Sequence, residues 1–426
     1  MAIPYVFVLI VLFLAAVPVA FALGATSIVV TAIERGFPFN AAFMVQKAVS
    51  GIDNFMLLSV PFFIYAGKVM NVGGVTHRIY AFAKSLVGSL RGGLAQVNVV
   101  ASIIFAGMTG TAVSEAAGLG TVVIKSMREE GYDDEFAVAV IAASSTIGPI
   151  IPPSVPLVIY ALMANVSVGG MLVAGLVPGL LMGLALMLWI AGISLRRDLP
   201  RGAPFRVGVV WTTFREGFLP LLTPAILIGG IVSGVFTPTE AAAIAALYAT
   251  FLAAVVYRVV GVRELVDIMR STVVDTGVIM LVVAMAMIYG YLVTRAGLTD
   301  AMVAWMAGVS TDPIVIGLII IGILLVIGCF LEATAAIIIL TPVLLPIMQA
   351  SGLDPMHMGV VIVLTMMIGL LTPPFGMVLF VLNRLSGVSL YRIVVAVTPF
   401  IIPLLIVNIL LLVFPKLVLF LPRLVM

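Results

Sequence analysis

The sequence predicts an all-α polytopic membrane protein made of two inverted repeats, each containing a re-entrant helical hairpin and a helix broken by prolines. Three observations lead to this prediction: an extreme apolar composition, a pattern of glycines and prolines that occurs twice, and an uneven distribution of basic residues. Together these features are typical of a secondary transporter.

Composition places the chain in a lipid bilayer. Apolar residues make up 63% of the 426 residues and charged residues only 9%, against about 25% charged residues in soluble domains. In lipid every backbone N–H and C=O must be hydrogen-bonded within the protein, which leaves helices or closed barrels. The apolar stretches 171–195 and 314–330 match the ~20 residues of a spanning helix and lack the alternation of barrel strands. The chain is therefore predicted to be helical.

Several functions are excluded by what the sequence lacks. No basic block resembles a nucleic-acid-binding surface, and the single cysteine, Cys329, excludes a disulfide framework or a cysteine metal cluster. His77 and His357 are too few for a His-rich metal site and are more simply loop or helix-end residues. The pair Gly67-Lys68 lacks the flanking residues of a phosphate loop, so we expect this chain to use no ATP.

Seven spanning helices are expected, and the apolar N-terminus is interpreted as a retained first helix, not as a cleaved signal peptide. The expected spans lie near 3–22, 52–72, 171–194, 216–235, 240–257, 273–292 and 393–414. Short apolar arms around tips of small and hydroxyl residues predict re-entrant hairpins over 93–127 and 314–349. Tandem prolines interrupt two broken helices, predicted over 136–165 and 357–384.

The hairpins and broken helices repeat in register. Adding 221 to a residue number maps residues 107–180 onto 328–401 without a gap, and the coincidences fall on residues that set backbone shape. The matched residues include Gly107 with Gly328, Gly148 with Gly369, and Pro152-Pro153 with Pro373-Pro374. We therefore divide the chain into a first repeat (1–195), a basic connector (196–215) and a second repeat (216–426).

Basic residues indicate that the two repeats have opposite orientations. The connector carries five arginines, so the positive-inside rule places it in the cytoplasm. Counting crossings from the connector, all but five of the 21 Lys and Arg residues fall on the cytoplasmic side. The five outside are Arg35, Lys47, Arg295, Lys416 and Arg423. Hairpin 93–127 then opens to the cytoplasm and hairpin 314–349 to the periplasm, which is the relation expected of inverted repeats.

Substrate and ion sites are expected where each hairpin tip meets the broken helix of its own repeat. Unwound carbonyls and Ser or Thr hydroxyls are the oxygen ligands that Na⁺ favours, and half-helix N-termini near Ser154 and Phe375 present positive dipole ends to an anionic substrate. The candidate sodium ligands are Thr109, Gly110, Ser145, Thr146, Gly148, Thr334, Gly369 and Thr372. The candidate substrate ligands are Thr111, Ser114, Ser154, Thr334 and Thr372.

These residues also have simpler explanations. Gly, Ser and Thr allow close packing of membrane helices, although the occurrence of the set twice in register favours a site. Glu115 and Glu332 lie in membrane-embedded segments, where a charge is costly and indicates function; hydrogen bonds to the hairpin backbone are the structural alternative. Either Thr237 or Thr239 is expected to cap the helix that follows, and Glu240 to complement the dipole of that helix.

Three segments resemble the large membrane subunit of TRAP transporters. They are Gly107-Met-Thr-Gly-Thr-Ala-Val-Ser-Glu-Ala-Ala-Gly-Leu-Gly120, Ile147-Gly-Pro-Ile-Ile-Pro-Pro-Ser154 and Leu371-Thr-Pro-Pro-Phe-Gly376. The resemblance covers nearly the whole chain and implies an elevator mechanism, Na⁺ as the coupling ion, and a carboxylate substrate such as a C4-dicarboxylate or sialic acid. By motif position it implies sodium sites at tip 109–114 with break 145–154 and at tip 332–334 with break 369–374, which adds Glu332 and Pro373 to the ligands.

The resemblance also implies a bacterial inner-membrane location and two partners. These are a small four-helix membrane subunit, expected as a separate polypeptide, and a periplasmic substrate-binding protein. The predicted function is a Na⁺-coupled importer of an organic acid and not an enzyme. The main alternative is a stand-alone Na⁺- or H⁺-coupled anion symporter of similar fold. A membrane hydrolase would lack a histidine base beside Ser114 or Ser154, and a passive channel would not need paired hairpins.

Overall fold

The computed structural model describes residues 3–35, 41–72, 74–197, 199–200, 202 and 204–425, and every regular element within these ranges is a helix. The first half contains α1 (Ile3–Leu14), α2 (Val19–Arg35), α3 (Ala41–Ile52), the 3₁₀ turn η1 (Phe55–Leu58), α4 (Ser59–Val72), α5 (Val75–Val87), α6 (Gly93–Thr109), α7 (Ala112–Glu129), α8 (Asp134–Ser145), α9 (Val155–Met163), α10 (Val168–Ala174) and α11 (Leu176–Arg196). The second half contains α12 (Val207–Val232), α13 (Pro238–Phe251), the π turn η2 (Leu252–Val256), α14 (Val262–Arg295), α15 (Leu298–Val309), α16 (Pro313–Gly328), α17 (Ala333–Ala350), α18 (Pro355–Gly369), α19 (Met377–Ser386), α20 (Leu390–Val413) and α21 (Lys416–Val425).

Helical segments long and apolar enough to cross a bilayer number seven in this part of the chain, which confirms the prediction of a multi-pass helical membrane protein. Six of them coincide with expected spans, and the seventh is Ala333–Ala350, an arm of the second hairpin. The longest is α14, whose 34 residues extend about 50 Å at 1.5 Å per residue. Because this exceeds the ~30 Å hydrocarbon core, α14 reaches beyond it.

The prediction of one spanning helix over 3–22 is wrong. The structure has two helices there, α1 and α2, joined by a turn that ends at Pro18. Ala16 adopts a φ of 58°, in the left-handed region, and Pro18 lacks the N–H that a continuous helix would need. The apolar composition of this segment does not reveal the break.

The second part of the basic connector is helical. Helix α12 begins at Val207, so Arg215 lies within its first three turns. The helix has no proline until Pro220, and its first three turns continue the basic segment as regular structure.

Each half contains a hairpin followed by a broken helix. In the first half α6 and α7 form the hairpin, and α8 and α9 are the two arms of the broken helix. In the second half α16 and α17 form the hairpin, and α18 and α19 are the arms. The halves interlock, because α9 packs on α17, α19 on α7, and α20 on α8. One cross-link is the Tyr160 hydroxyl, which donates to the Pro355 carbonyl at 2.7 Å.

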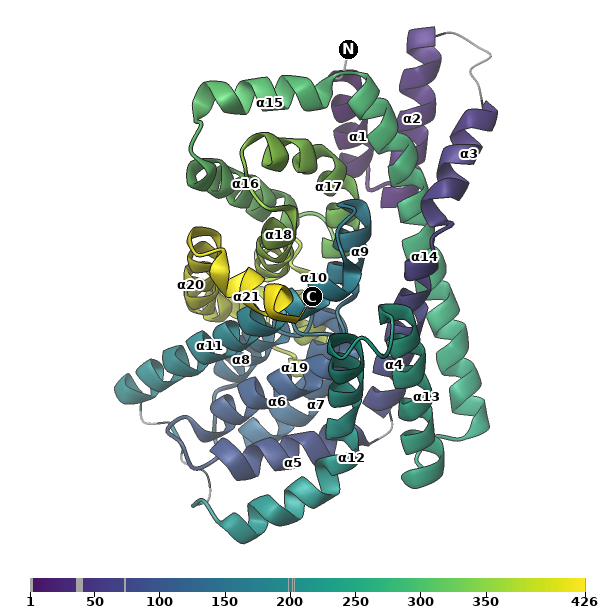
Figure 1. Ribbon diagram of the computed structural model, residues 1–426. Helices are drawn as coiled ribbons and strands as arrows, with labels where there is room; N and C mark the ends of the chain where they lie inside the picture. Colours follow the sequence, from purple (N-terminus) through teal and green to yellow (C-terminus); the bar gives the residue numbers. More distant parts are fainter. Residues whose placement is uncertain are drawn as a thin grey trace.

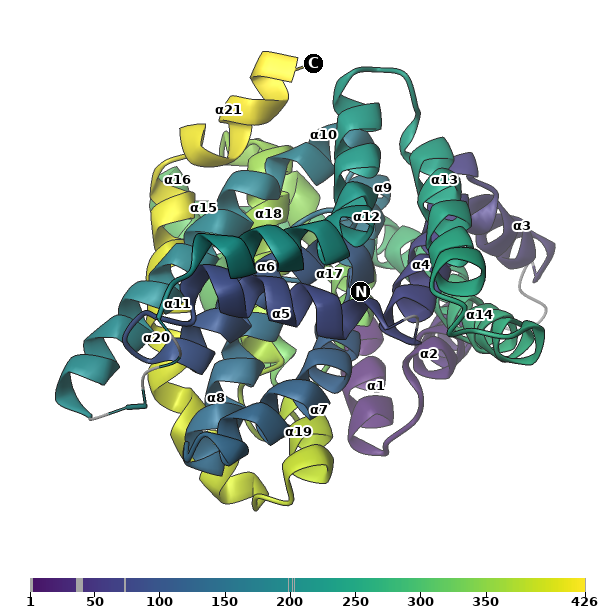
Figure 2. The ribbon, with the colours of Figure 1, turned by 90° about the horizontal axis from the view of Figure 1, so that it is seen from below.

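A second group of helices lies along one side of this core. Helices α2, α3 and α4 pack against α14, and α4 also packs against α13 (Figure 1). We call α1–α4, α13 and α14 the panel, and α6–α11 with α16–α21 the hairpin core. The panel stands beside the core in the perpendicular view as well (Figure 2).

Two helices lead from the panel to the hairpins. Helix α5 follows α4 and packs on α6, whereas α15 follows α14 and packs on α17. In Figure 1, α15 crosses the top of the molecule and α5 the bottom. Each begins after a glycine in the left-handed region, Gly74 with φ 69° and Gly297 with φ 77°, a conformation that costs glycine little.

Candidate functional site

The first hairpin tip touches the break between α8 and α9. The tip turns at Gly110, whose φ is 64°, and Thr111 caps α7 by accepting a hydrogen bond from the Ser114 N–H at 3.4 Å. A Cβ built on Gly110 would lie only 2.6 Å from the carbonyl oxygen of Pro153. The tip and the break that the sequence pairs therefore do lie together. The side chain of Thr109 is outside the described part of the structure.

Buried hydroxyl groups surround this first break. Ser145 and Thr146 donate to the carbonyls of Ala142 and Ala143 at 2.8 and 2.6 Å. Ser154 caps α9 by accepting from the Leu157 N–H at 3.2 Å, and it donates to the Pro149 carbonyl. Because each hydroxyl uses its proton on the backbone, its remaining lone pairs are available to a cation.

Glu115 belongs to the same site. Its side chain is 1% exposed, and neither carboxyl oxygen has a hydrogen-bond partner among the described residues. A Cβ at Gly148 would stand 2.2 Å from its Oε2, so the absence of a side chain at 148 makes room for the carboxyl group. The hydroxyl of Ser102 lies beside it. A buried carboxyl group without a partner is costly, and here it faces the first break.

At the second tip the predicted carboxylate has a structural role. Glu332 is the N-cap of α17, and its Oε2 accepts from the Ala335 N–H at 2.9 Å. Thr334 follows in the first turn of α17 and is half-buried. The structural alternative for Glu332, a hydrogen bond to the hairpin backbone, is therefore present in the structure. Glu332 is also exposed.

The second tip also contacts its own break. The N–H of Phe375 donates to the Cys329 carbonyl at 3.2 Å. A Cβ on Gly369 would lie 2.7 Å from the Cα of Gly328, so the backbones of α16 and α18 touch where the repeat places two glycines. Thr372 donates to the Ile368 carbonyl at 3.0 Å.

The two breaks differ in exposure. Pro152 and Pro153 are buried, whereas Pro373 and Pro374 are exposed. Both Pro-Pro peptide bonds are cis. Gly107 packs against Pro224 of α12, which helps to cover the first tip, since a Cβ at Gly107 would lie 2.5 Å from the Pro224 Cβ.

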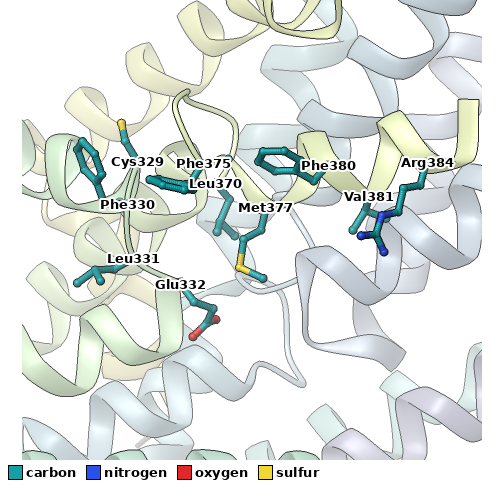
Figure 3. Close-up of a pocket in the computed structure, with 12 residues that line it drawn as sticks. Cys329, Phe330, Leu331, Glu332, Leu370, Phe375, Met377, Phe380, Val381 and Arg384 are labelled. Carbon is teal, nitrogen blue, oxygen red and sulfur yellow. The ribbon is translucent and has the colours of Figure 1, made fainter. Parts of the chain in front are cut away.

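A cavity of about 410 Å³ opens at the second tip (Figure 3). Its walls are the tip 328–332, the end of the break and one face of α19. Phe330 and Phe375 meet there with ring centroids 6.0 Å apart. The charged residues that line it are Glu332 and Arg384; Figure 3 shows Arg384 at the right of the view, well apart from Glu332. Thr334 and Thr372, both predicted as ligands, do not line it.

Sequence reasoning missed Arg384 as a cavity residue and counted it only as a cytoplasmic charge. The signal was available, because Arg384 is a basic residue in the short helix α19 that follows the second break. What the sequence could not give is the direction of its side chain, which depends on how α19 packs against the second tip.

In each broken helix a buried hydroxyl accepts a hydrogen bond from an asparagine of another helix. The Asn98 amide donates to the Ser144 hydroxyl at 2.7 Å, and the Asn408 amide donates to the Thr365 hydroxyl at 2.8 Å. Ser144 and Thr365 are equivalent under the shift of 221 residues, but the asparagines come from non-equivalent helices, α6 and α20. The described residues contain no group of three or more His, Cys, Asp or Glu side chains that could hold a metal ion.

Comparison with known proteins gives the family. Residues 6–417 match the family described as the tripartite ATP-independent periplasmic transporter, DctM component. The chain belongs to the TRAP transporter large permease family. This permease is 43% identical over 416 residues to the sialic acid TRAP transporter large permease protein SiaM of Vibrio cholerae, a match that covers 97% of this chain and 96% of that protein.

Other relatives agree. The C4-dicarboxylate TRAP transporter large permease protein DctM of Pseudomonas aeruginosa is 35% identical over 386 residues, covering 91% of this permease and 90% of that protein. The sialic acid TRAP transporter permease protein SiaT of Haemophilus influenzae is 38% identical over 408 residues, covering 96% of this chain and 66% of that protein. The permease is thus a transporter subunit and not an enzyme.

A solved structure shares the fold. The YdaH transporter of Alcanivorax borkumensis superposes with a TM-score of 0.61 at 16% identity, over 89% of the permease and 90% of that chain. At this identity the likeness concerns the fold alone.

Proposed function

We propose that this permease carries an organic acid across the bacterial inner membrane, driven by Na⁺, as the large subunit of a binding-protein-dependent importer. The observation that carries the proposal is that each of two hairpin tips lies against a proline break that carries hydroxyl and carbonyl oxygens. The names of relatives support the substrate class, since they specify sialic acid, 2,3-diketo-L-gulonate and C4-dicarboxylates.

Two sodium sites follow from this arrangement. The first uses the tip residues 109–110 with oxygens of Ser145, Thr146 and Gly148, of which Gly148 lies against the buried Glu115. The second uses the tip residues 332–334 with oxygens of Gly369, Thr372 and Pro373. Hydroxyl and unwound carbonyl oxygens suit Na⁺, and bound charge at the first site offsets the burial of Glu115.

The substrate carboxylate is proposed to meet the half-helix N-termini beside the tips. Thr111 and Ser114 offer hydroxyls at the N-terminus of α7, and Thr334 offers one at the second tip. Ser154 and Thr372 would have to turn their hydroxyl protons from the Pro149 and Ile368 carbonyls toward the substrate in order to donate to it. Helix N-termini bind anions because their N–H groups lack partners. The cavity at the second tip adds the guanidinium of Arg384, which suits a carboxylate.

Movement of the hairpin core against the panel is the proposed mechanism. Inverted repeats support it, because α5 and α15 enter their hairpins from opposite ends of the molecule (Figure 1). In this mechanism the core carries Na⁺ and substrate past a fixed panel, as alternating access requires. A small four-helix membrane subunit and a periplasmic substrate-binding protein complete the importer.

Uptake into proteoliposomes tests the proposal. The permease, its small subunit and the purified binding protein are assayed with radiolabelled sialic acid, 2,3-diketo-L-gulonate and succinate, with and without an inward Na⁺ gradient. We expect uptake of one of these acids only when both Na⁺ and the binding protein are present. Uptake without the binding protein would instead identify a stand-alone symporter, and uptake unchanged by Na⁺ would refute sodium coupling.

A serine substitution tests the first sodium site. Ser145→Ala removes one oxygen, and we expect the Na⁺ concentration for half-maximal uptake to rise about tenfold, which corresponds to ~1.4 kcal/mol. Ser194→Ala is the matched control, because Ser194 makes the same type of hydrogen bond to its own helix, to the Ala191 carbonyl at 2.8 Å, away from both tips. Equal sodium dependence of the two variants would remove Ser145 from the site.

A further inference from the structure

A second cavity lies between the panel and the hairpin core. Its volume is about 390 Å³, within the range of small-molecule sites. One wall comes from the end of α3 and from α14, and the other from α9 and α17. Figure 1 shows these elements facing each other, with α3 and α14 at the side of the molecule and α9 and α17 nearer its centre. It is lined by none of the tip or break residues described above.

Lys47 supplies the positive charge of this cavity. Its ammonium lies 5.0 Å from the ring centroid of Tyr291 and 5.8 Å from that of Phe43, and such contacts orient a cation without neutralising it. Among the described residues no carboxylate lies within ion-pair distance of it. By contrast Lys68 pairs with Asp275 at 2.6 Å and Lys84 with Glu130 at 2.7 Å.

Uncharged polar groups accompany the ammonium. Ser50 and Thr294 line the cavity with hydroxyls that each use their proton on a backbone carbonyl of their own helix. Asn54 lines it as well; its Oδ1 accepts from the Met56 N–H, which leaves its amide N–H groups as donors. Met163 and Met287 form part of the apolar lining. The Lys47 ammonium, the Asn54 amide as a donor and an apolar wall suit a small organic anion.

We propose that this cavity is a carboxylate-binding site, with Lys47 as its charged contact, separate from the two hairpin tips. The ligand class rests on the proposed function, since the transported organic acid carries the carboxylate. The distribution of basic residues puts Lys47 on the outer side, so the site would be met by an acid entering from the periplasm. An anionic lipid headgroup has related chemistry and is separated from the acid by the test below.

Protection of the lysine amine tests the site directly. The permease in phosphatidylcholine nanodiscs is treated with an amine-acetylating reagent, and acetylation at each lysine is measured by mass spectrometry. With sialic acid, 2,3-diketo-L-gulonate or succinate at about ten times its dissociation constant, we expect acetylation of Lys47 to fall about tenfold. Lys125, which is exposed on α7, is the internal control and should not change. Sodium chloride of equal ionic strength should protect neither lysine.

Two results would overturn the proposal. Equal acetylation of Lys47 with and without all three acids would exclude a carboxylate site. Protection in phosphatidylglycerol nanodiscs without any acid, together with no protection by acids in phosphatidylcholine, would assign the cavity to lipid. The labelling requires neither Na⁺ nor the binding protein. Its result can therefore be interpreted even if the proposed transport function fails its own test.

Substitutions at Lys47 give a second readout. Lys47→Met keeps the length of the side chain and removes the charge, and we expect the KM for uptake to rise about tenfold with little change in the maximal rate, as for the loss of one charged contact. The variant Lys47→Arg should have the wild-type KM, because it keeps the positive charge. An unchanged KM in Lys47→Met, with Lys125→Met as the matched control, would show that the charge does not act on substrate.

Discussion

At the scale of single residues, the first site depends on a glycine that leaves space for a carboxyl group. A Cβ added to Gly148 would lie 2.2 Å from Glu115 Oε2, so a methyl group at residue 148 would overlap the carboxyl group. The carboxyl group is buried and without a described hydrogen-bond partner, so it remains available to whatever binds at the break. Glu332 differs, because its carboxylate is exposed and already caps α17.

Gly148→Ala should therefore disturb the first site. The new methyl group would collide with Glu115, and we expect a loss of about 1–3 kcal/mol in the free energy of unfolding, as for other overpacked sites, together with loss of uptake. Thermal unfolding in detergent measures the first effect. Gly192→Ala is the control, since nothing lies within 4 Å of a Cβ at Gly192.

The double variant Gly148→Ala/Glu115→Ala separates the collision from other causes. It removes the carboxyl group that the methyl would meet, so most of the lost stability should return while uptake remains impaired. If Gly148→Ala is as stable as Gly192→Ala, the close approach of Glu115 to Gly148 is not a feature of the protein in the membrane.

At the scale of elements, helix ends are set by local chemistry that the sequence displays. Thr237 accepts from the Glu240 N–H at 3.3 Å, and Glu240 Oε2 accepts from the Thr237 N–H at 2.8 Å, which forms a complete capping box at α13. The sequence left Thr237 and Thr239 as alternatives, and the structure selects Thr237. Thr239 instead lies within the first turn and contacts the Phe55 carbonyl at 3.4 Å.

Thr237→Ala tests this cap. Loss of an N-cap side chain costs about 1 kcal/mol, so the unfolding temperature should fall measurably. Thr212→Ala removes an exposed threonine hydroxyl in α12 that bonds only within its own helix, and it should change stability by less than ~0.5 kcal/mol. Similar shifts in both variants would mean that the capping box does not stabilise α13.

At the scale of the whole molecule, the permease contains a panel and a hairpin core, together with α5, α12 and α15. The panel meets the core where α4 packs on α6 and α9 and where α14 packs on α17. One contact between them is Gly290 of α14 against Pro342 of α17, where a Cβ at Gly290 would lie 3.5 Å from the Pro342 Cβ. That separation is within the range that a disulfide spans. The contact thus offers a means to fasten the two parts together.

The variant Gly290→Cys/Pro342→Cys, made with Cys329→Ser, tests relative movement. Oxidation should link the panel to the core and abolish uptake, and a reductant should restore it. The single variants Gly290→Cys and Pro342→Cys, each made with Cys329→Ser and treated with the same oxidant, are the controls, because neither can link the panel to the core. A linked Gly290–Pro342 variant that transports at the normal rate would contradict the proposed movement of the core against the panel.

Some of this architecture was predictable from the sequence. Apolar runs, the Pro152-Pro153 and Pro373-Pro374 pairs and the glycine-rich tips predict helices, breaks and turns, since these depend on side-chain polarity and backbone chemistry within a few residues. The motifs of the first tip and the two breaks were sufficient to indicate the family. The prediction from apolar runs was wrong over 3–22, because apolar composition is equally compatible with one long helix or two shorter ones.

The tertiary structure decided which side chains meet across distant segments. The sequence alone determined that the chain is a helical membrane protein of the TRAP permease family, because composition and local motifs carry that information. Only the packing of α7 on α8 brings Glu115 to Gly148, only the position of α19 turns Arg384 into a cavity residue, and only the meeting of panel and core encloses Lys47. Such contacts depend on the relative placement of whole helices, which no local pattern in the sequence specifies.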